Sequence, residues 1–134
     1  MAFELTEQIE KHLTDDEIVW LTTVTPSGRP APRPVWFSWD GAVITIYTQP
    51  DGAKVRHLAA NDQVTVNFNS TPHGTDVVVI SGRAELVPDS PPPTQVPGVL
   101  EKYRARIEQM GYAAEWFDSY SLAIRVTPER AWTI

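Results

Sequence analysis

Three prolines at alternate positions, Pro30, Pro32 and Pro34, constrain this 134-residue chain more than any other local feature. In an extended strand, residues two apart point their backbone nitrogens to the same edge, and proline has no N–H there. That edge cannot complete a regular ladder, so we predict an edge strand whose carbonyls, and whose free amides from Val35 onward, stay available. A planar heteroaromatic ring with alternating donors and acceptors would suit this edge. The alternative is an edge that proline protects against aggregation.

The rest of the chain predicts short strands separated by turns. Alternating apolar and β-branched residues indicate strands at 18–24, 31–39, 42–48, 64–68, 76–86 and 122–126, with Gly82 as a bulge or close-approach point. Helical spacing predicts helices at 5–13, 53–60 and about 100–110, ended by Gly111. We therefore predict a mainly β protein: a six-stranded antiparallel barrel with a few helices. It forms one domain over residues 1–134, with a helix–loop insertion around 88–120.

Composition excludes several classes of function. The chain has 11 basic and 17 acidic residues, a net charge of −6, which argues against nucleic acid and against an anionic membrane as partners. It has no Cys, so it has no disulfide, thiolate nucleophile or zinc–sulfur site. His12, His57 and His73 lack the spacing of metal motifs, and we expect surface or loop histidines and no metal. Without a signal-peptide pattern or a long apolar run, we expect a soluble, cytoplasmic protein.

The usual motifs of enzyme chemistry are missing. The seven glycines form no G-x-G-x-x-G, no phosphate-binding loop and no G-x-S-x-G. No side chain stands out as an acid, a base or a nucleophile, so the sequence leaves the catalytic residues unknown. If the protein is an enzyme, a bound cofactor must supply the chemistry.

A second informative segment runs from Tyr47 to His57. A strand is predicted to end at Thr48, a turn with Gly52 follows, and a short helix begins with Lys54 and Arg56 in its first turns. The unpaired amides and the partial positive charge of a helix N-terminus favour phosphate, and cationic side chains add charge-assisted bonds. The alternative is that Asp51 caps the helix and the cations are simply solvated. Together with the proline edge, this segment describes a flavin-sized site.

At these residues the sequence resembles the pyridoxamine 5'-phosphate oxidase-like family of split β-barrels, which bind flavin mononucleotide (FMN) or a deazaflavin. It looks closest to the branch of F-420-dependent oxidoreductases. The likeness covers most of the chain. It is carried by Leu21–Val24, Gly28–Pro30, Pro34–Phe37, Tyr47–Thr48, Lys54–Leu58, Asn61–Asp62 and Arg125–Trp132.

The resemblance implies a homodimer with a cofactor in each of two clefts between the subunits. By position, the cofactor-binding residues would be Arg33, Pro34, Val35 and Trp36 along the ring and its chain, Tyr47 and Thr48 beside the chain and phosphate, Lys54 and Arg56 on the phosphate, and Trp132 from the partner chain. Two positions depart from the family pattern. Ala53 stands where relatives often have Arg, and Ser38 stands where the oxidase branch commonly has Lys.

Three functions follow from this resemblance. The first is an oxidoreductase in which coenzyme F-420, a deazaflavin, exchanges hydride with a small unsaturated or conjugated substrate. The second keeps the fold and uses FMN, as a reductase or oxidase. The third is a cofactor carrier without turnover.

Overall fold

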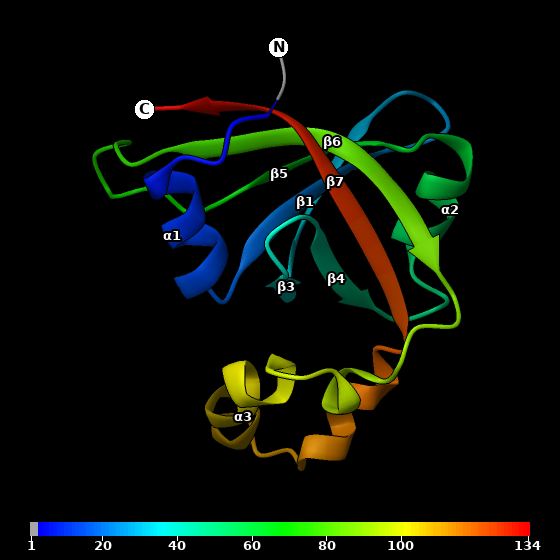
Figure 1. Cartoon of the computed structure of the whole chain (residues 1–134). Helices are drawn as coiled ribbons and strands as arrows, with labels where there is room; N and C mark the ends of the chain where they lie inside the picture. Colours follow the sequence, from blue (N-terminus) through cyan, green and yellow to red (C-terminus); the bar gives the residue numbers. More distant parts are fainter. Residues whose placement is uncertain (1–2) are drawn as a thin grey trace.

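The computed structural model describes residues 3–134 and contains one curled antiparallel sheet with helices around it (Figure 1). The seven strands lie in the order β2-β1-β5-β6-β7-β4-β3. Their bounds are Val19–Val24 (β1), Pro30–Val35 (β2), Phe37–Trp39 (β3), Ile44–Thr48 (β4), Gln63–Asn67 (β5), Val78–Val87 (β6) and Leu122–Thr133 (β7). The helices are Glu7–Asp15 (α1), Ala53–Ala60 (α2) and Val99–Gln109 (α3), with 3₁₀ turns at Pro93–Gln95 (η1) and Ala114–Ser119 (η2).

The sheet curls because its two edge strands are consecutive in the chain. β2 and β3 lie at opposite ends of the strand order, yet only Trp36 separates them, so the sheet must bend round for its ends to meet. The mainly β, split-barrel class predicted from the sequence is therefore confirmed. The predicted strand count was wrong: the single strand expected over 31–39 is two strands. The break falls at Trp36, whose ring stacks on Tyr103 at 4.3 Å.

The core lies inside the curl. Along β1, β5 and β6 buried and partly exposed residues alternate, so one face of each strand packs inward. The inward side chains of this main core include Leu21, Phe37, Val66, Ile80 and Ile124. A second cluster lies beneath the helical insertion and consists of Tyr47, Val99, Tyr103, Ile107 and Phe117.

The close approach predicted at Gly82 is confirmed. The register between β6 and β7 shifts between Ser81 and Gly82. A Cβ atom on Gly82 would lie 2.3 Å from the backbone oxygen of Thr127, so no side chain fits there. β7 extends to Thr133 rather than ending near Val126, because the long β6 continues to pair with it beyond the bulge.

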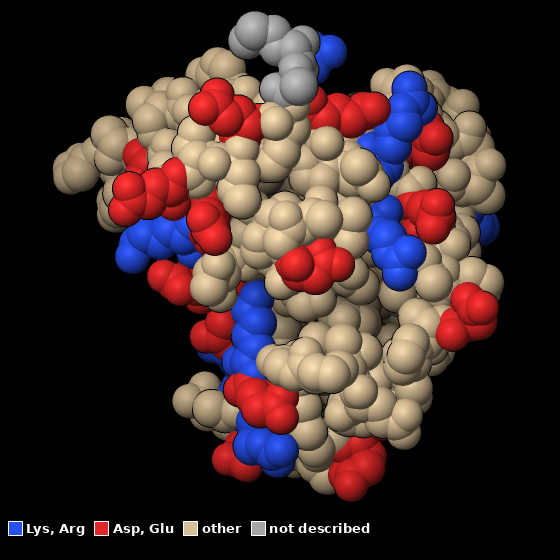
Figure 2. All heavy atoms as spheres, viewed as in Figure 1, with Lys and Arg blue, Asp and Glu red and all other residues tan. Residues whose placement is uncertain are grey.

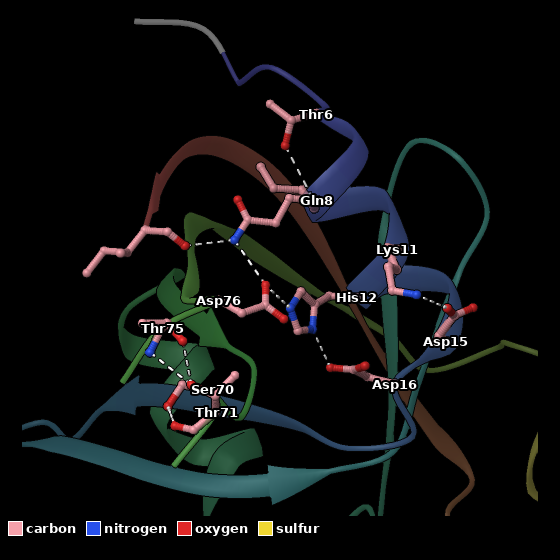
Figure 3. Close-up of polar contacts among 12 residues, drawn as sticks. Thr6, Gln8, Lys11, His12, Asp15, Asp16, Ser70, Thr71, Thr75 and Asp76 are labelled. Atoms are coloured by element: carbon pink, nitrogen blue, oxygen red, sulfur yellow. Dashed lines mark hydrogen bonds and ion pairs between the residues drawn. The ribbon is translucent and has the colours of Figure 1, made fainter. Parts of the chain in front are cut away.

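Helix α1 is capped by Thr6, whose hydroxyl accepts a bond from the amide of Ile9 at 3.2 Å. Its residue His12 is buried, so the expectation of a surface or loop histidine was wrong there. Figure 3 shows the reason: Nδ1 lies 2.6 Å from Asp16 and Nε2 lies 3.0 Å from Asp76. Burial lowers the pKa of His12, but hydrogen bonds and charge interactions with these carboxylates outweigh it, and the net pKa is raised.

The insertion between β6 and β7 holds η1, α3 and η2 and lies below the barrel in Figure 1. Its α3 ends as predicted, with Gly111 just beyond it at φ 84°, in the left-handed region. On the face in Figure 2 the basic side chains do not gather into one patch but alternate with acidic ones. Within the described chain, no helix combines the length and apolarity needed to cross a membrane.

Candidate cofactor cleft

A cleft of about 800 Å³ lies between the barrel and the insertion. The barrel side comprises residues of β2, β4 and the start of α2, together with Trp36. The insertion side comprises residues at and after the end of α3. The lining residues are Arg33, Pro34, Val35, Trp36, Tyr47, Thr48, Gln49, Gly52, Lys54, Met110, Tyr112, Trp116, Phe117 and Tyr120.

The edge of β2 that borders this cleft is open, as the prolines predict. β2 pairs only with β1, in a register that sets Pro34 opposite Trp20 and Pro32 opposite Thr22. The amides that pair with β1 must therefore belong to the residues between the prolines and to Val35, which stands opposite Val19, and the proline carbonyls face outward. The prediction that the amide of Val35 stays available was wrong, because the register turns it toward β1. Consistent with this, the Nη1 atom of Arg33 donates to the carbonyl of Pro32 at 2.7 Å.

The N-terminus of α2 also meets the cleft. Its N-cap is Gly52, with no side-chain cap and no acidic residue in the first turn. The alternative in which Asp51 caps this helix is thus not what the structure shows. The free amides and dipole of this helix end favour a negatively charged group.

Two cationic side chains share the cleft. Lys54 is half-buried, and burial together with the nearby charge of Arg33 lowers the pKa of Lys54. Within residues 3–134 neither side chain has a carboxylate within ion-pair distance. Two like charges placed together without an acidic partner favour binding of an anion.

Aromatic rings form the apolar part of the site. Trp36 lies flat on Tyr103 and meets Phe117 edge-on at 5.1 Å. Tyr47 is buried, and its hydroxyl lies 3.2 Å from that of Ser38. Burial raises the pKa of Tyr47, so its phenol stays protonated near neutral pH.

The cleft brings together seven of the nine residues predicted for cofactor binding and leaves two outside. Arg56 is exposed on α2, with Nη1 3.5 Å from the carbonyl of Asp51. Trp132 lies ten residues along β7 from Leu122, the residue that pairs with cleft residue Thr48. At about 3.3 Å per residue that is a separation of roughly 33 Å. Trp132 therefore cannot close the cleft of its own chain.

Sequence reasoning missed the insertion's share of the cleft. The residues concerned are Met110, Tyr112, Trp116, Phe117 and Tyr120. A signal was present, since four aromatic residues fall within positions 112–120. Their spacing follows no regular helix or strand period, because they lie on a helix end, a loop and a 3₁₀ turn.

Comparison with known proteins places the fold. A family model described as pyridoxamine 5'-phosphate oxidase matches residues 5–134. Among curated proteins, none matches the sequence.

Three solved structures illustrate the range of the fold. An F420 reductase is 25% identical with a TM-score of 0.67, over 96% of this chain and 98% of the other. The heme storage protein HutZ from Vibrio cholerae is 18% identical with a TM-score of 0.62, over 99% and 95% of the chains. An FAD-binding protein from Mesorhizobium loti is 19% identical with a TM-score of 0.63, over 95% and 92%.

Proposed function

Because the chain belongs to the pyridoxamine 5'-phosphate oxidase family, we propose that the cleft binds a flavin-type cofactor, and specifically coenzyme F-420. The protein is then an oxidoreductase that transfers hydride between F-420 and a small unsaturated or conjugated substrate. One observation carries the proposal: a single cleft joins the open edge of β2, an uncapped helix end and two cations that have no carboxylate partner among the described residues. The overall likeness to an F420 reductase supports the choice of cofactor.

The negative end of the cofactor is held at the start of α2. Lys54 and the first amides of α2 bind the phosphate, and Arg33 adds a second positive charge nearby. Each charge-assisted bond contributes about 1.5–3 kcal/mol. Binding also relieves the repulsion between Lys54 and Arg33, because an anion between two cations attracts both.

The ring system lies along the backbone from Pro34 to Trp36. The outward proline carbonyls of this edge are acceptors for the donor groups of a flavin-type ring. Trp36 and Phe117 make this end of the cleft apolar and exclude water. When bound, F-420 supplies the hydride chemistry, and the chain contributes binding, orientation and a dry wall.

The proposal includes a homodimer. Pro34, Trp20, Asn67, Val79 and Trp132 stand opposite one another in turn across five strands, on the face turned away from the core. This row has no charge, and its last member, Trp132, is 59% exposed. An uncharged row of this kind with an exposed tryptophan is typical of the centre of a subunit interface. A partner subunit packed on this face can bring its Trp132 to the cleft, which Trp132 cannot do within one chain.

FMN is the alternative cofactor, in a reductase or oxidase. The observation in its favour is the shared architecture with an FAD-binding protein, which shows that the fold accommodates flavins. A carrier that binds the cofactor without turnover uses the same cleft. A heme, which HutZ stores, is less supported here, since of the side chains that ligate heme iron the cleft is lined by Met and Tyr and by neither His nor Cys.

Titration of the purified protein with F-420 and with FMN, followed by calorimetry and absorbance, tests these functions. Micromolar binding of F-420 is expected, and a yellow protein that retains FMN would favour the alternative. Substrate-dependent oxidation of the reduced cofactor separates an enzyme from a carrier. If neither cofactor binds at micromolar concentration, the proposed function is wrong.

A dimer by analytical ultracentrifugation is also expected. The variant Trp132→Asp should be monomeric and bind F-420 more weakly. A wild-type protein that stays monomeric at micromolar concentration would contradict the dimer.

A further inference from the structure

Two large apolar side chains at the end of α3 stay exposed at the cleft. Met110 is 41% exposed and Tyr112 is 49% exposed. Neither belongs to either hydrophobic cluster of the protein, so burial in a core does not explain their position. Exposed apolar groups that border a concave site are typical of a binding surface.

The position of Tyr112 is fixed by the backbone. After α3 the amide of Gly111 donates to the carbonyl of Glu108 at 3.0 Å, and the amide of Tyr112 donates to that of Ile107 at 3.2 Å. This pair of bonds is a Schellman motif, and its left-handed residue is Gly111 at φ 84°. The motif reverses the chain and holds Tyr112 at the cleft before any ligand arrives. A preset ring loses little entropy on binding.

Tyr112 is the outer member of a continuous set of rings. It stacks on Trp116 at 4.8 Å with an interplanar angle of 6°. Trp116 in turn meets Tyr120 at 5.3 Å and Trp36 at 5.9 Å, both edge-on. The set leads from the rim of the cleft to Trp36, beside the open edge of β2. It offers aromatic surface to a ligand at the point where the proposed cofactor ring lies.

The charges of the cleft also restrict the charge of the ligand that it can bind. Within residues 3–134 no Asp or Glu lines the cleft, and its charged lining residues there are the cations Arg33 and Lys54. A cationic ring would be repelled, whereas a neutral or anionic ring would not. At about 800 Å³ the cleft lies in the upper part of the usual range for ligand sites.

We propose that Tyr112, Trp116 and Tyr120 form the substrate-recognition wall, which selects a flat, conjugated ring that is neutral or anionic. This rests on the proposed function, because it assigns the substrate class of the same cleft. It goes beyond that function by placing specificity in the insertion, while cofactor binding resides in the barrel.

The test compares two probes that share a carbon skeleton, 2-naphthol and trans-decahydro-2-naphthol. The first is flat and aromatic, and the second is puckered and saturated. Calorimetric titrations use the full-length protein, with and without F-420. We expect naphthol to bind at least tenfold more tightly than its saturated counterpart. Equal affinity for the two probes would overturn the proposal.

Variants of the exposed Tyr112 provide the matched control. Tyr112→Ala should weaken naphthol binding by about 2- to 12-fold, the usual effect of losing one aromatic pair. Tyr112→Phe keeps the ring and should bind like the wild type. Tyr112→Phe should also bind F-420 within twofold of the wild type.

The outcomes separate this proposal from the proposed function. Naphthol binding by cofactor-free protein can be measured even if neither F-420 nor FMN binds, and that result would refute the function alone. Normal F-420 binding with no effect of Tyr112→Ala on naphthol would refute the recognition wall alone. If Tyr112→Ala changes the dissociation constant of the dimer but not the affinity for naphthol, Tyr112 contacts the second subunit instead of the substrate. That result would also overturn the proposed recognition wall.

Discussion

Replacing Lys54 with methionine tests the charge arrangement of the cleft, because it should affect binding and stability in opposite directions. Methionine keeps the length and apolar stem of the side chain and removes the positive charge. In the free protein, Lys54 is half-buried, near Arg33, and has no acidic partner within residues 3–134. The charge therefore costs stability when the cleft is empty and contributes affinity when an anion occupies it.

The size of each effect follows from the geometry. Loss of one charge-assisted hydrogen bond costs about 1.5–3 kcal/mol of binding free energy. At about 1.4 kcal/mol per tenfold, Lys54→Met should weaken binding of F-420 or FMN by about 10- to 150-fold. Because Lys54 is partly exposed, solvent screens its repulsion by Arg33 to about 0.2–1 kcal/mol. Removing that repulsion should raise the Tm of the free protein by about 1–4 °C.

Calorimetric titration and thermal unfolding of the free protein measure the two effects. Arg56→Met is the control, since Arg56 lies on the same helix but outside the cleft. It should change affinity by less than twofold. The reasoning is refuted if Lys54→Met binds as tightly as the wild type, or if Arg56→Met loses as much affinity. A lower Tm for free Lys54→Met than for the free wild type would contradict the destabilising repulsion between Lys54 and Arg33.

Three further predictions concern the scaffold. Gly82→Ala should lower the free energy of unfolding by about 1–3 kcal/mol in urea, because its Cβ would meet the β7 backbone at 2.3 Å; unchanged stability would contradict this close approach. His12, whose pKa is raised above 6.5, stabilises the fold below that pH, and the stabilisation is lost as pH rises through the raised pKa. Asp76, whose pKa is lowered from 3.8, contributes to stability above about pH 3.8. The contributions of His12 and Asp76 are therefore both present between about pH 4 and pH 6.5. In the wild type, the free energy of unfolding in urea should decline between pH 5 and pH 9, and in His12→Gln this decline should be absent. The same pH dependence in both proteins would contradict the contribution of His12. Tyr103→Phe should lower stability by about 1–3 kcal/mol, since its hydroxyl accepts the buried amide of Phe37 at 2.9 Å, and wild-type stability in urea would argue against this role.

Local chemistry in the sequence was sufficient for much of the fold and the cofactor side of the cleft. Proline at 30, 32 and 34 requires an edge strand wherever it occurs, because the missing N–H is a covalent property. Gly82 and Gly111 mark a close approach and a helix end for similar reasons. The turn and cations around Lys54 lie close together in the chain, so their arrangement depends little on distant contacts.

Only the tertiary structure could decide where segments far apart in the chain meet. The single strand expected over 31–39 is broken at Trp36, whose ring stacks on Tyr103, 67 positions away. The burial of His12 depends on Asp76 from a distant loop. The aromatic residues of the insertion form one wall only after α3 and η2 fold beneath the barrel. The placement of Arg56 outside the cleft likewise depends on how α2 rotates against the sheet. Residue type determines what a side chain can bind, but long-range packing determines which side chains share a site.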